Sequence, residues 1–143
     1  MKKAFSLSVV IATRNRERWL TDALESLTRQ TRPPDEIIVV DNASEDNTRE
    51  AVSQFQHRLP VKYVFEGKKG IPYARNCGVK LAKGDIIAFL DDDSSADENW
   101  LRYIEMPFIR DPNIGIVGGL IKPHNVSNGP IEKFYIENML TSR

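Results

Sequence analysis

The stretch Gly84–Asp93, which reads GDIIAFLDDD, decides the fold expected for this chain. Its centre, residues 86–90, is a short and continuous apolar run, which is typical of a strand buried on both faces. A glycine precedes the run and three aspartates follow it directly. We therefore expect a buried strand that ends at the carboxylates of Asp91, Asp92 and Asp93.

Three similar apolar runs precede this one and indicate further strands at residues 7–12, 36–41 and 61–65. Apolar residues at helical spacing lie between the runs and predict intervening helices. These helices are expected at residues 19–27, from Ser44 or Asp46 to about Phe55, and from Pro72 to about Leu81. Strand–helix alternation of this kind predicts an α/β fold with a mostly parallel sheet and helices on both faces. We expect a single domain over residues 1–143.

The last third of the chain has a less regular pattern. Apolar residues at 100, 101, 104 and 108 predict one more helix, broken near Pro107. Two short strands are expected at residues 114–117 and 120–121, and an amphipathic stretch at residues 131–139.

The composition excludes several classes of protein. The chain has 143 residues, of which 41% are hydrophobic and 28% charged, as in ordinary soluble proteins. Its 20 basic residues balance its 20 acidic ones, which argues against binding of nucleic acid through bulk charge. The apolar run near the N-terminus lacks a cleavage pattern, and no stretch is long enough to cross a bilayer. We expect a cytoplasmic protein, with peripheral association at the inner face of the membrane as an option.

The three consecutive aspartates point to a cation. Adjacent carboxylates at a strand end repel one another, and a hard divalent cation such as Mg²⁺ or Mn²⁺ would offset that repulsion. Magnesium usually takes one or two protein carboxylates and completes its shell with water and phosphate oxygens. The alternative interpretation is a solvated acidic loop before the next helix.

Two other kinds of acidic site can be tested against the spacing of residues after Asp91. A calcium loop beginning at Asp91 requires Gly and Glu where Ala96 and Arg102 stand, which excludes it. Asp91 and Asp93 also match the Asp-x-Asp of an aspartyl-phosphate phosphatase, although that pair normally follows the first strand. The phosphatase interpretation stays as a minor alternative.

Further polar residues follow the other predicted strands, and ligands of parallel sheets bind at this edge. Asp41 is either a turn-forming residue or an acceptor for a nucleobase N–H or a ribose hydroxyl. Lys69 and Gly70 precede a predicted helix and are either solvated or suited to bind a phosphate. The guanidinium of Arg75 suits phosphate or carboxylate. Glycine-rich motifs of NAD-binding and P-loop proteins are absent, and neither His57 nor His124 belongs to a recognisable nucleophile system.

Four ordered segments resemble glycosyltransferase family 2. They are VVIATRNR at residues 9–16, VVDNAS at 39–44, GIPYARNCG at 70–78 and GDIIAFLDDD at 84–93. The resemblance covers about residues 6–120. It implies a Rossmann-like GT-A fold, a nucleotide-sugar donor and a divalent cation, Mn²⁺ or Mg²⁺.

The resemblance also implies roles for individual residues. Thr13 and Arg14 would border the nucleobase and Asp41 would hydrogen-bond it, whereas Lys69, Gly70 and Arg75 would lie near the ribose or the diphosphate. Asp93 is the expected direct metal ligand. Asp91 and Asp92 are expected at the ribose or in the metal's water shell, with Asp91 the second metal candidate. The pair Trp100 and Leu101 is expected to pack rather than to react.

The expected reaction is an inverting transfer of a sugar, with a UDP-sugar favoured as donor, to a hydroxyl of a saccharide, lipid or protein. The family's catalytic base has no clear counterpart in this sequence, so the acceptor half is expected to be short or missing and the domain truncated. Such a domain would expose apolar surface and could self-associate. The alternative function is a non-catalytic nucleotide-sugar-binding module.

Overall fold

The computed structural model describes residues 5–111, 113–119 and 121–122. Four parallel strands form one sheet in the order β3-β2-β1-β4. The strands are β1 (Leu7–Thr13), β2 (Glu36–Asp41), β3 (Val61–Phe65) and β4 (Ile86–Phe89). The four strands expected in residues 7–90 are thus confirmed, with ends that differ by at most one residue.

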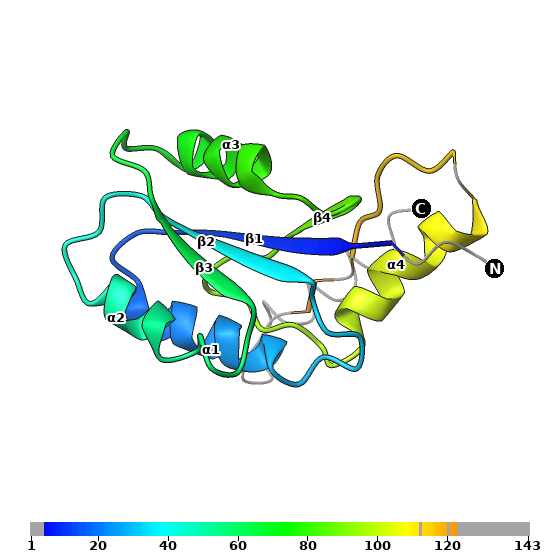
Figure 1. Cartoon of the computed structure of the whole chain (residues 1–143), viewed down its shortest axis with the longest axis horizontal. Helices are drawn as coiled ribbons and strands as arrows, with labels where there is room; N and C mark the ends of the chain where they lie inside the picture. Colours follow the sequence, from blue (N-terminus) through cyan, green and yellow to red (C-terminus); the bar gives the residue numbers. More distant parts are fainter. Residues whose placement is uncertain (1–4, 112, 120, 123–143) are drawn as a thin grey trace, which may run out of the picture.

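Helices cover both faces of this sheet, as expected. They are α1 (Glu17–Leu27), α2 (Thr48–Ser53), α3 (Ile71–Leu81) and α4 (Trp100–Arg110). Figure 1 shows α3 alone on one face, with α1 and α2 on the other. The loops that follow β1, β2 and β3 lie together at the left of that view, because parallel strands end at the same edge.

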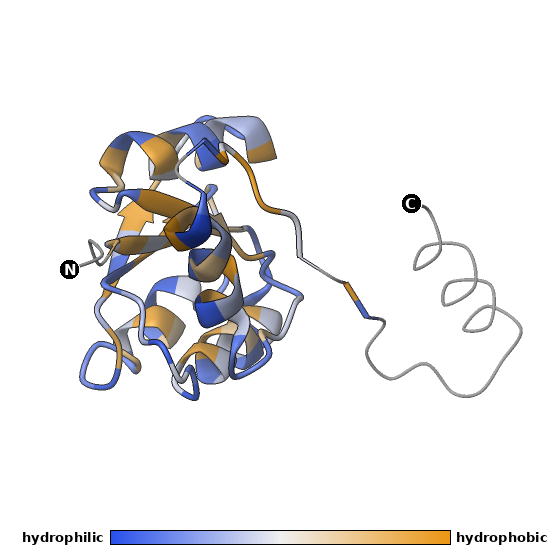
Figure 2. Cartoon of the chain, turned by 90° about the vertical axis from the view of Figure 1, so that its right-hand side faces the viewer, coloured by the Kyte–Doolittle hydropathy of each residue, from blue (hydrophilic) through white to orange (hydrophobic). Residues whose placement is uncertain are grey.

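Alternating side chains of the central strands build two cores. Val9, Ile11, Ile37 and Val39 belong to the larger core, which also contains the buried faces of α1 and α2. Side chains of the opposite parity, such as Ile38 and Val40, form a smaller core with Ala74 of α3. Figure 2 shows these apolar strands between the helices. All of β2 is buried, as a parallel strand with both faces covered should be.

The small core depends on close approach of α3 to the sheet at Gly78. A Cβ atom added to Gly78 would collide with the side chain of Val10 and would lie 3.3 Å from Cγ2 of Val40. Gly78 is therefore the position at which the helix backbone rests on the sheet.

Two expectations for the last third of the chain are wrong. Helix α4 continues through Pro107 to Arg110, because Leu101, Ile104 and Phe108 on one of its faces pack against the large core. Residues 114–117 form no strand, because no described strand pairs with them. Ile116 in this segment is 91% exposed. The expected helix from Ser44 or Asp46 is shorter and begins at Thr48. The expectations for residues 120 and 131–139 lie on residues that are not described.

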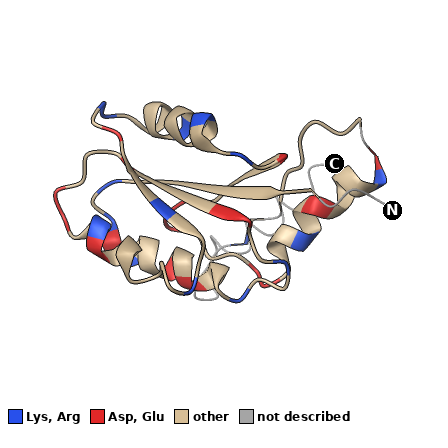
Figure 3. Ribbon diagram, in the orientation of Figure 1, with Lys and Arg blue, Asp and Glu red and all other residues tan. Residues whose placement is uncertain are grey.

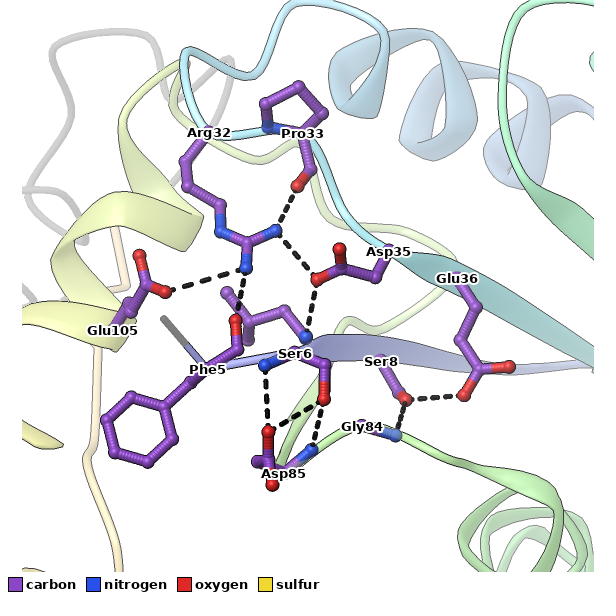
Figure 4. A network of polar contacts seen from close by, with 11 residues as sticks. Phe5, Ser6, Ser8, Arg32, Pro33, Asp35, Glu36, Gly84, Asp85 and Glu105 are labelled. Atoms are coloured by element: carbon purple, nitrogen blue, oxygen red, sulfur yellow. Dashed lines mark hydrogen bonds and ion pairs between the residues drawn. The ribbon is translucent and has the colours of Figure 1, made fainter. Parts of the chain in front are cut away.

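A polar network closes the opposite edge of the sheet, at the amino ends of the strands (Figure 4). Arg32 donates hydrogen bonds to the carbonyls of Phe5 and Pro33 and pairs with Asp35 at 2.9 Å and Glu105 at 3.5 Å. This single guanidinium ties the loop before β2 to the chain before β1 and to α4.

Glu36 is the buried acid of this edge. Its Oε1 accepts hydrogen bonds from Ser8 Oγ at 2.6 Å and from the amide of Lys83, and its Oε2 accepts one from Lys62 Nζ at 3.1 Å. Burial opposes ionisation of this carboxyl, but these hydrogen bonds outweigh burial and lower the pKa of Glu36 to about 2.

The lowered pKa makes the contribution of Glu36 to stability depend on pH. The ionised form stabilises the fold fully above pH 4.5, and this stabilisation is lost as the pH falls toward 2. We expect Glu36→Gln to lower the free energy of unfolding by about 3 kcal/mol at pH 7. At pH 3 the loss should be smaller than at pH 7 by about 2 kcal/mol. Urea unfolding at both pH values measures this. Glu98→Gln, which changes an exposed carboxylate, is the control, and an equal loss for Glu36→Gln at both pH values would contradict the prediction.

Candidate functional site

The three aspartates directly after β4 have different surroundings. Asp92 is buried, with 7% of its surface exposed, whereas Asp91 and Asp93 are exposed. The buried carboxylate is fixed by the end of β1, because Thr13 Oγ1 donates a hydrogen bond of 2.8 Å to Asp92 Oδ2. The strand pairing of β1 with β4 thus brings the end of β1 into contact with the aspartates that follow β4.

Arg16 lies between two of these acids. Its Nη1 is 3.2 Å from Oδ1 of Asp92 and 3.1 Å from Oδ2 of Asp93. The negative charge of Asp92, and to a lesser extent that of Asp93, raises the pKa of Arg16 above its ordinary value. The carboxylate oxygens of Asp92 and Asp93 therefore converge on one cationic point.

Asp91 has a different arginine as its partner. Arg75, in the second turn of α3, donates from Nη2 to Asp91 Oδ1 at 2.7 Å. Both side chains are about half exposed, so the pair lies at the surface. Helix α3 carries basic residues and no acidic ones (Figure 3). The pair joins this helix to the acidic strand end across the sheet edge.

Asp41 ends β2 beside Thr13, its register partner in β1. Its carboxylate is buried and accepts hydrogen bonds from the amide of Ser44 at 2.9 Å and from the hydroxyl of Tyr63 at 2.6 Å. Burial, followed by the hydrogen bond to Asp41, raises the pKa of Tyr63 to about 12, so the phenol remains a donor at neutral pH. Asp41 thus forms the turn after β2, and its orientation at the sheet edge is fixed on both oxygens.

Asn42 fixes the loop between β3 and α3. Its amide nitrogen donates to the carbonyls of Glu66 at 3.2 Å and Lys68 at 2.8 Å, and its Oδ1 accepts from the amide of Gly70 at 2.6 Å. Gly70 has φ 135°, a conformation that side-chain-bearing residues rarely adopt. In this structure the Gly70 N–H therefore donates within the protein, to Oδ1 of Asn42.

The loops after β1 and β2 are tied to each other. The amide of Asn15 donates to Ser44 Oγ at 2.9 Å, and Asn15 Oδ1 accepts from the amide of Glu45 at 2.7 Å. Asn15 and Ala43 have φ values of 53° and 58°, in the left-handed region. Such backbone is unusual for alanine and is often found at functional sites.

The structure brings some of the predicted residues together and leaves others apart. Thr13, Asp92 and Asp93 are joined through Arg16, and Arg75 and Asp91 form a separate pair at the same edge. Arg14 and Lys69 are exposed at the same edge, outside both groups. Leu101 is fully buried and Trp100 packs against the large core, which confirms the expected packing role of that pair.

Three residues of the edge were missed by the sequence analysis, namely Arg16, Asn42 and Tyr63. Arg16 and Asn42 lie inside two of the four segments that resemble the family, so the resemblance could have pointed to them. Tyr63 looks like an ordinary strand residue, and only the pairing of β3 with β2 brings it beside Asp41.

The acids can be compared with the needs of a divalent cation. Among the described residues no three His, Cys, Asp or Glu side chains form a ready metal-binding group. Two carboxylate oxygens that converge on a guanidinium nitrogen do fit a cation that takes one or two carboxylates and completes its shell with water and phosphate. The donor set of Asp92 and Asp93 therefore suits Mg²⁺ or Mn²⁺.

A hollow lies at the other edge of the sheet, at the amino ends of the strands. It has a volume of roughly 580 Å³ and is lined by Ser8, Glu36, Lys62 and Gly84, among others. The buried acid there already accepts three hydrogen bonds from the protein, and ligands of parallel sheets bind at the carboxyl ends. The edge with the three aspartates is the better candidate site.

Comparison with known proteins identifies the class to which this fold and site belong. The model of Glycosyl transferase family 2 matches residues 8–139. The protein is a member of glycosyltransferase family 2, and its parallel sheet with alternating helices is GT-A-like. No described helix has the length and apolar character to span a membrane.

Individual relatives agree with this assignment. The chain is 40% identical over 102 residues to validoxylamine A glucosyltransferase of Streptomyces hygroscopicus subsp. limoneus, covering 68% of this chain and 22% of that protein. The structure of S. aureus TarS 1–349 in complex with UDP has a TM-score of 0.68 and 30% identity, covering 73% of this chain and 32% of that one.

A third relative was solved with a donor and a metal. Mannosyltransferase PcManGT of Pyrobaculum calidifontis, in complex with GDP-Man and Mn²⁺, has a TM-score of 0.71 and 27% identity. The match covers 79% of this chain and 34% of that chain. In each of these three comparisons the chain spans about a third of the relative's length or less.

Proposed function

We propose that this chain binds a nucleoside-diphosphate sugar, with a UDP-sugar favoured, and takes part in its metal-assisted, inverting transfer to an acceptor hydroxyl of a saccharide, lipid or protein. The observation that carries the proposal is the convergence of Asp92 and Asp93 on one cationic point at the carboxyl edge of the sheet. The family assignment and the relatives solved with UDP or with GDP-Man and Mn²⁺ support it.

The residues of the edge divide into those that hold the base and those that hold the diphosphate. Thr13 and Arg14 border the nucleobase, and the fixed carboxylate of Asp41 accepts a hydrogen bond from it. Arg75 and Lys69 supply positive charge near the ribose or diphosphate, with Gly70 shaping the loop between them. Asp41 already accepts two hydrogen bonds and keeps further lone pairs for a ligand.

The metal is held by Asp93 and a second carboxylate, from Asp91 or Asp92. The convergence of Asp92 and Asp93 favours Asp92 for this second position, since Asp91 pairs with Arg75. A bound divalent cation supplies Lewis-acid stabilisation of the charge that develops on the departing diphosphate. Arg75 adds fixed positive charge on the same side, and Thr13 keeps Asp92 in place. No catalytic base is assigned.

Nucleotide binding can be tested by thermal shift. We expect UDP with Mn²⁺ to raise the unfolding temperature more than GDP or dTDP with Mn²⁺, and more than UDP with a chelator. A nucleotide at a hundredfold excess over its Kd would add about 2.7 kcal/mol to the free energy of unfolding. Absence of any metal-dependent shift with all three nucleotides would refute the proposed site. A larger shift with GDP would change only the preferred base.

The second candidate, a non-catalytic binding module, is separated from the enzyme by product release. Both the enzyme and the binding module would show the metal-dependent increase in unfolding temperature with nucleotide. Only the enzyme would release nucleoside diphosphate from a donor in the presence of an acceptor, above the rate of spontaneous donor hydrolysis. A coupled assay for the released diphosphate, with acceptors of each of the three classes, measures this.

A further inference from the structure

Arg16 occupies the position at which the acids of the site converge. Its Nη1 is 3.2 Å from Asp92 and 3.1 Å from Asp93, so one guanidinium pairs with both carboxylates and offsets one of their two negative charges. Without this partner, the buried Asp92 would keep only the neutral hydrogen bond from Thr13 in the described structure. A buried carboxylate without a cation is costly, which explains why a positive group is needed there when no metal is bound.

The rest of the site does not depend on Arg16 to stay in place. Thr13 binds Oδ2 of Asp92, the oxygen that Arg16 does not use, at 2.8 Å. The Asp92 side chain is only 9% exposed, whereas that of Arg16 is 51% exposed. The long and exposed side chain of Arg16 has room to move its guanidinium into solvent. The Asp92 carboxylate would then remain oriented by Thr13 and by its own burial.

A guanidinium that bridges these two carboxylates occupies the position that a divalent cation bridging them would take, and the two cations repel each other. Arginine keeps its charge at all ordinary pH values, so it cannot make way by losing a proton and must move. We infer that Arg16 is a built-in counter-cation of Asp92 and Asp93, which holds the two carboxylates together before metal binding and is displaced from them by the metal. This inference rests on the proposed metal site and adds a residue that competes with the metal.

Competition of this kind predicts an unusual mutational effect. Removal of a positive charge from Arg16 should strengthen metal binding, whereas substitution of a residue that supports the metal should weaken it. We expect Arg16→Gln to lower the Kd for Mn²⁺ roughly three- to fivefold, which corresponds to the upper part of the range for the loss of one partly exposed ion pair. Arg16→Lys, which keeps the charge but lacks the fork, should give an intermediate Kd.

The measurement is direct titration with Mn²⁺, in which electron paramagnetic resonance counts the free ion in the absence of nucleotide. Arg18→Gln is the matched control, because it removes the same charge from an exposed position two residues along the chain. Its Kd for Mn²⁺ should stay within about twofold of that of the unmodified protein, since charges in solvent are screened.

A second readout separates competition from a purely structural role. Arg16→Gln should lower the unfolding temperature in the absence of metal and should gain a larger increase from Mn²⁺ than the unmodified protein does. A structural role alone would lower the unfolding temperature equally with and without Mn²⁺. If Arg16→Gln does not fold, the intermediate Kd of Arg16→Lys carries the same test.

The outcomes distinguish this inference from the proposed function. A Kd for Mn²⁺ that is unchanged or higher in Arg16→Gln overturns the role of Arg16, while binding by the unmodified protein would still support the metal site. Binding that is seen only in Arg16→Gln supports the inference. Absence of Mn²⁺ binding in the unmodified protein and in both Arg16 variants overturns the metal site and the role of Arg16 together.

Discussion

Asp93→Asn should remove metal-dependent nucleotide binding, with an affinity for UDP in the presence of Mn²⁺ that is weaker by roughly 100-fold or more. The substitution replaces one of the two carboxylates that converge on the cation position by a neutral amide. Hard divalent cations bind charged oxygen ligands far better than neutral ones, and the diphosphate is held largely through the cation. Calorimetric titration of UDP in the presence and absence of Mn²⁺ measures the effect.

Asp22→Asn is the control for this change. Asp22 is an exposed acid on α1, and the substitution alters the net charge by the same amount away from the site. UDP affinity should remain within about twofold of that of the unmodified protein, since exposed charges are screened by salt. If Asp93→Asn retains the full metal-dependent affinity, the assignment of this residue as a metal ligand is wrong.

Gly78→Ala should lower the free energy of unfolding by about 1–2 kcal/mol. The added methyl group collides with Val10 and approaches Val40 of the sheet, and overpacking of this kind costs about 1–3 kcal/mol. The higher helix propensity of alanine offsets up to about 1 kcal/mol of that cost. Gly78→Val should be worse, because it adds two more methyl groups at the same contact. Urea unfolding at pH 7 measures both variants.

Gly115→Ala provides the matched comparison, since a Cβ atom at that position meets nothing within 4 Å. Its free energy of unfolding should be unchanged or slightly higher. Equal effects at the two glycines would show that α3 does not rest on the sheet at Gly78. The prediction also bears on the site, because α3 carries Arg75 and a displaced helix would lengthen its 2.7 Å contact with Asp91.

The sheet could be predicted from local patterns because its strands are buried on both faces. A run such as Ile37–Val40 has no polar alternation, as expected of a parallel strand covered on both faces. The expectation that an apolar run forms a strand was wrong for residues 114–117, which are also apolar. A strand also needs a neighbour to accept its hydrogen bonds, and that requirement cannot be read from the run itself.

The continuation of α4 through Pro107 shows a different limit. A proline removes one helical hydrogen bond, which favours a break when propensity alone is considered. Residues 101, 104 and 108 lie on one face of the helix and pack against the large core, so tertiary packing outweighs the lost bond. The Asp111 amide still bonds to the carbonyl of Pro107 at 2.9 Å, which extends the helical pattern beyond the proline.

The candidate site was predictable where residue type alone restricts the chemistry, and not where geometry decides. Three aspartates after a strand point to a cation without any structure. Arg16 stands among other charges in the segment Arg14–Arg18 and looks like a solvated residue of a helix start. Its role depends on the left-handed turn at Asn15 and on the pairing of β1 with β4, which place it against acids more than 70 positions away.

The anchoring of the loop at residues 66–70 by Asn42 has a consequence for redesign of donor preference. Asn42 hydrogen-bonds to main-chain atoms of this loop, namely two carbonyls and one amide, and the Glu66 side chain accepts a further hydrogen bond from the amide of Lys68. Libraries that vary the side chains at positions 68 and 69 should therefore retain the path of the loop, provided that Asn42, Glu66 and Gly70 are kept. In the donor site proposed above, this loop would let sugar or base selectivity be exchanged without rebuilding the scaffold beneath it.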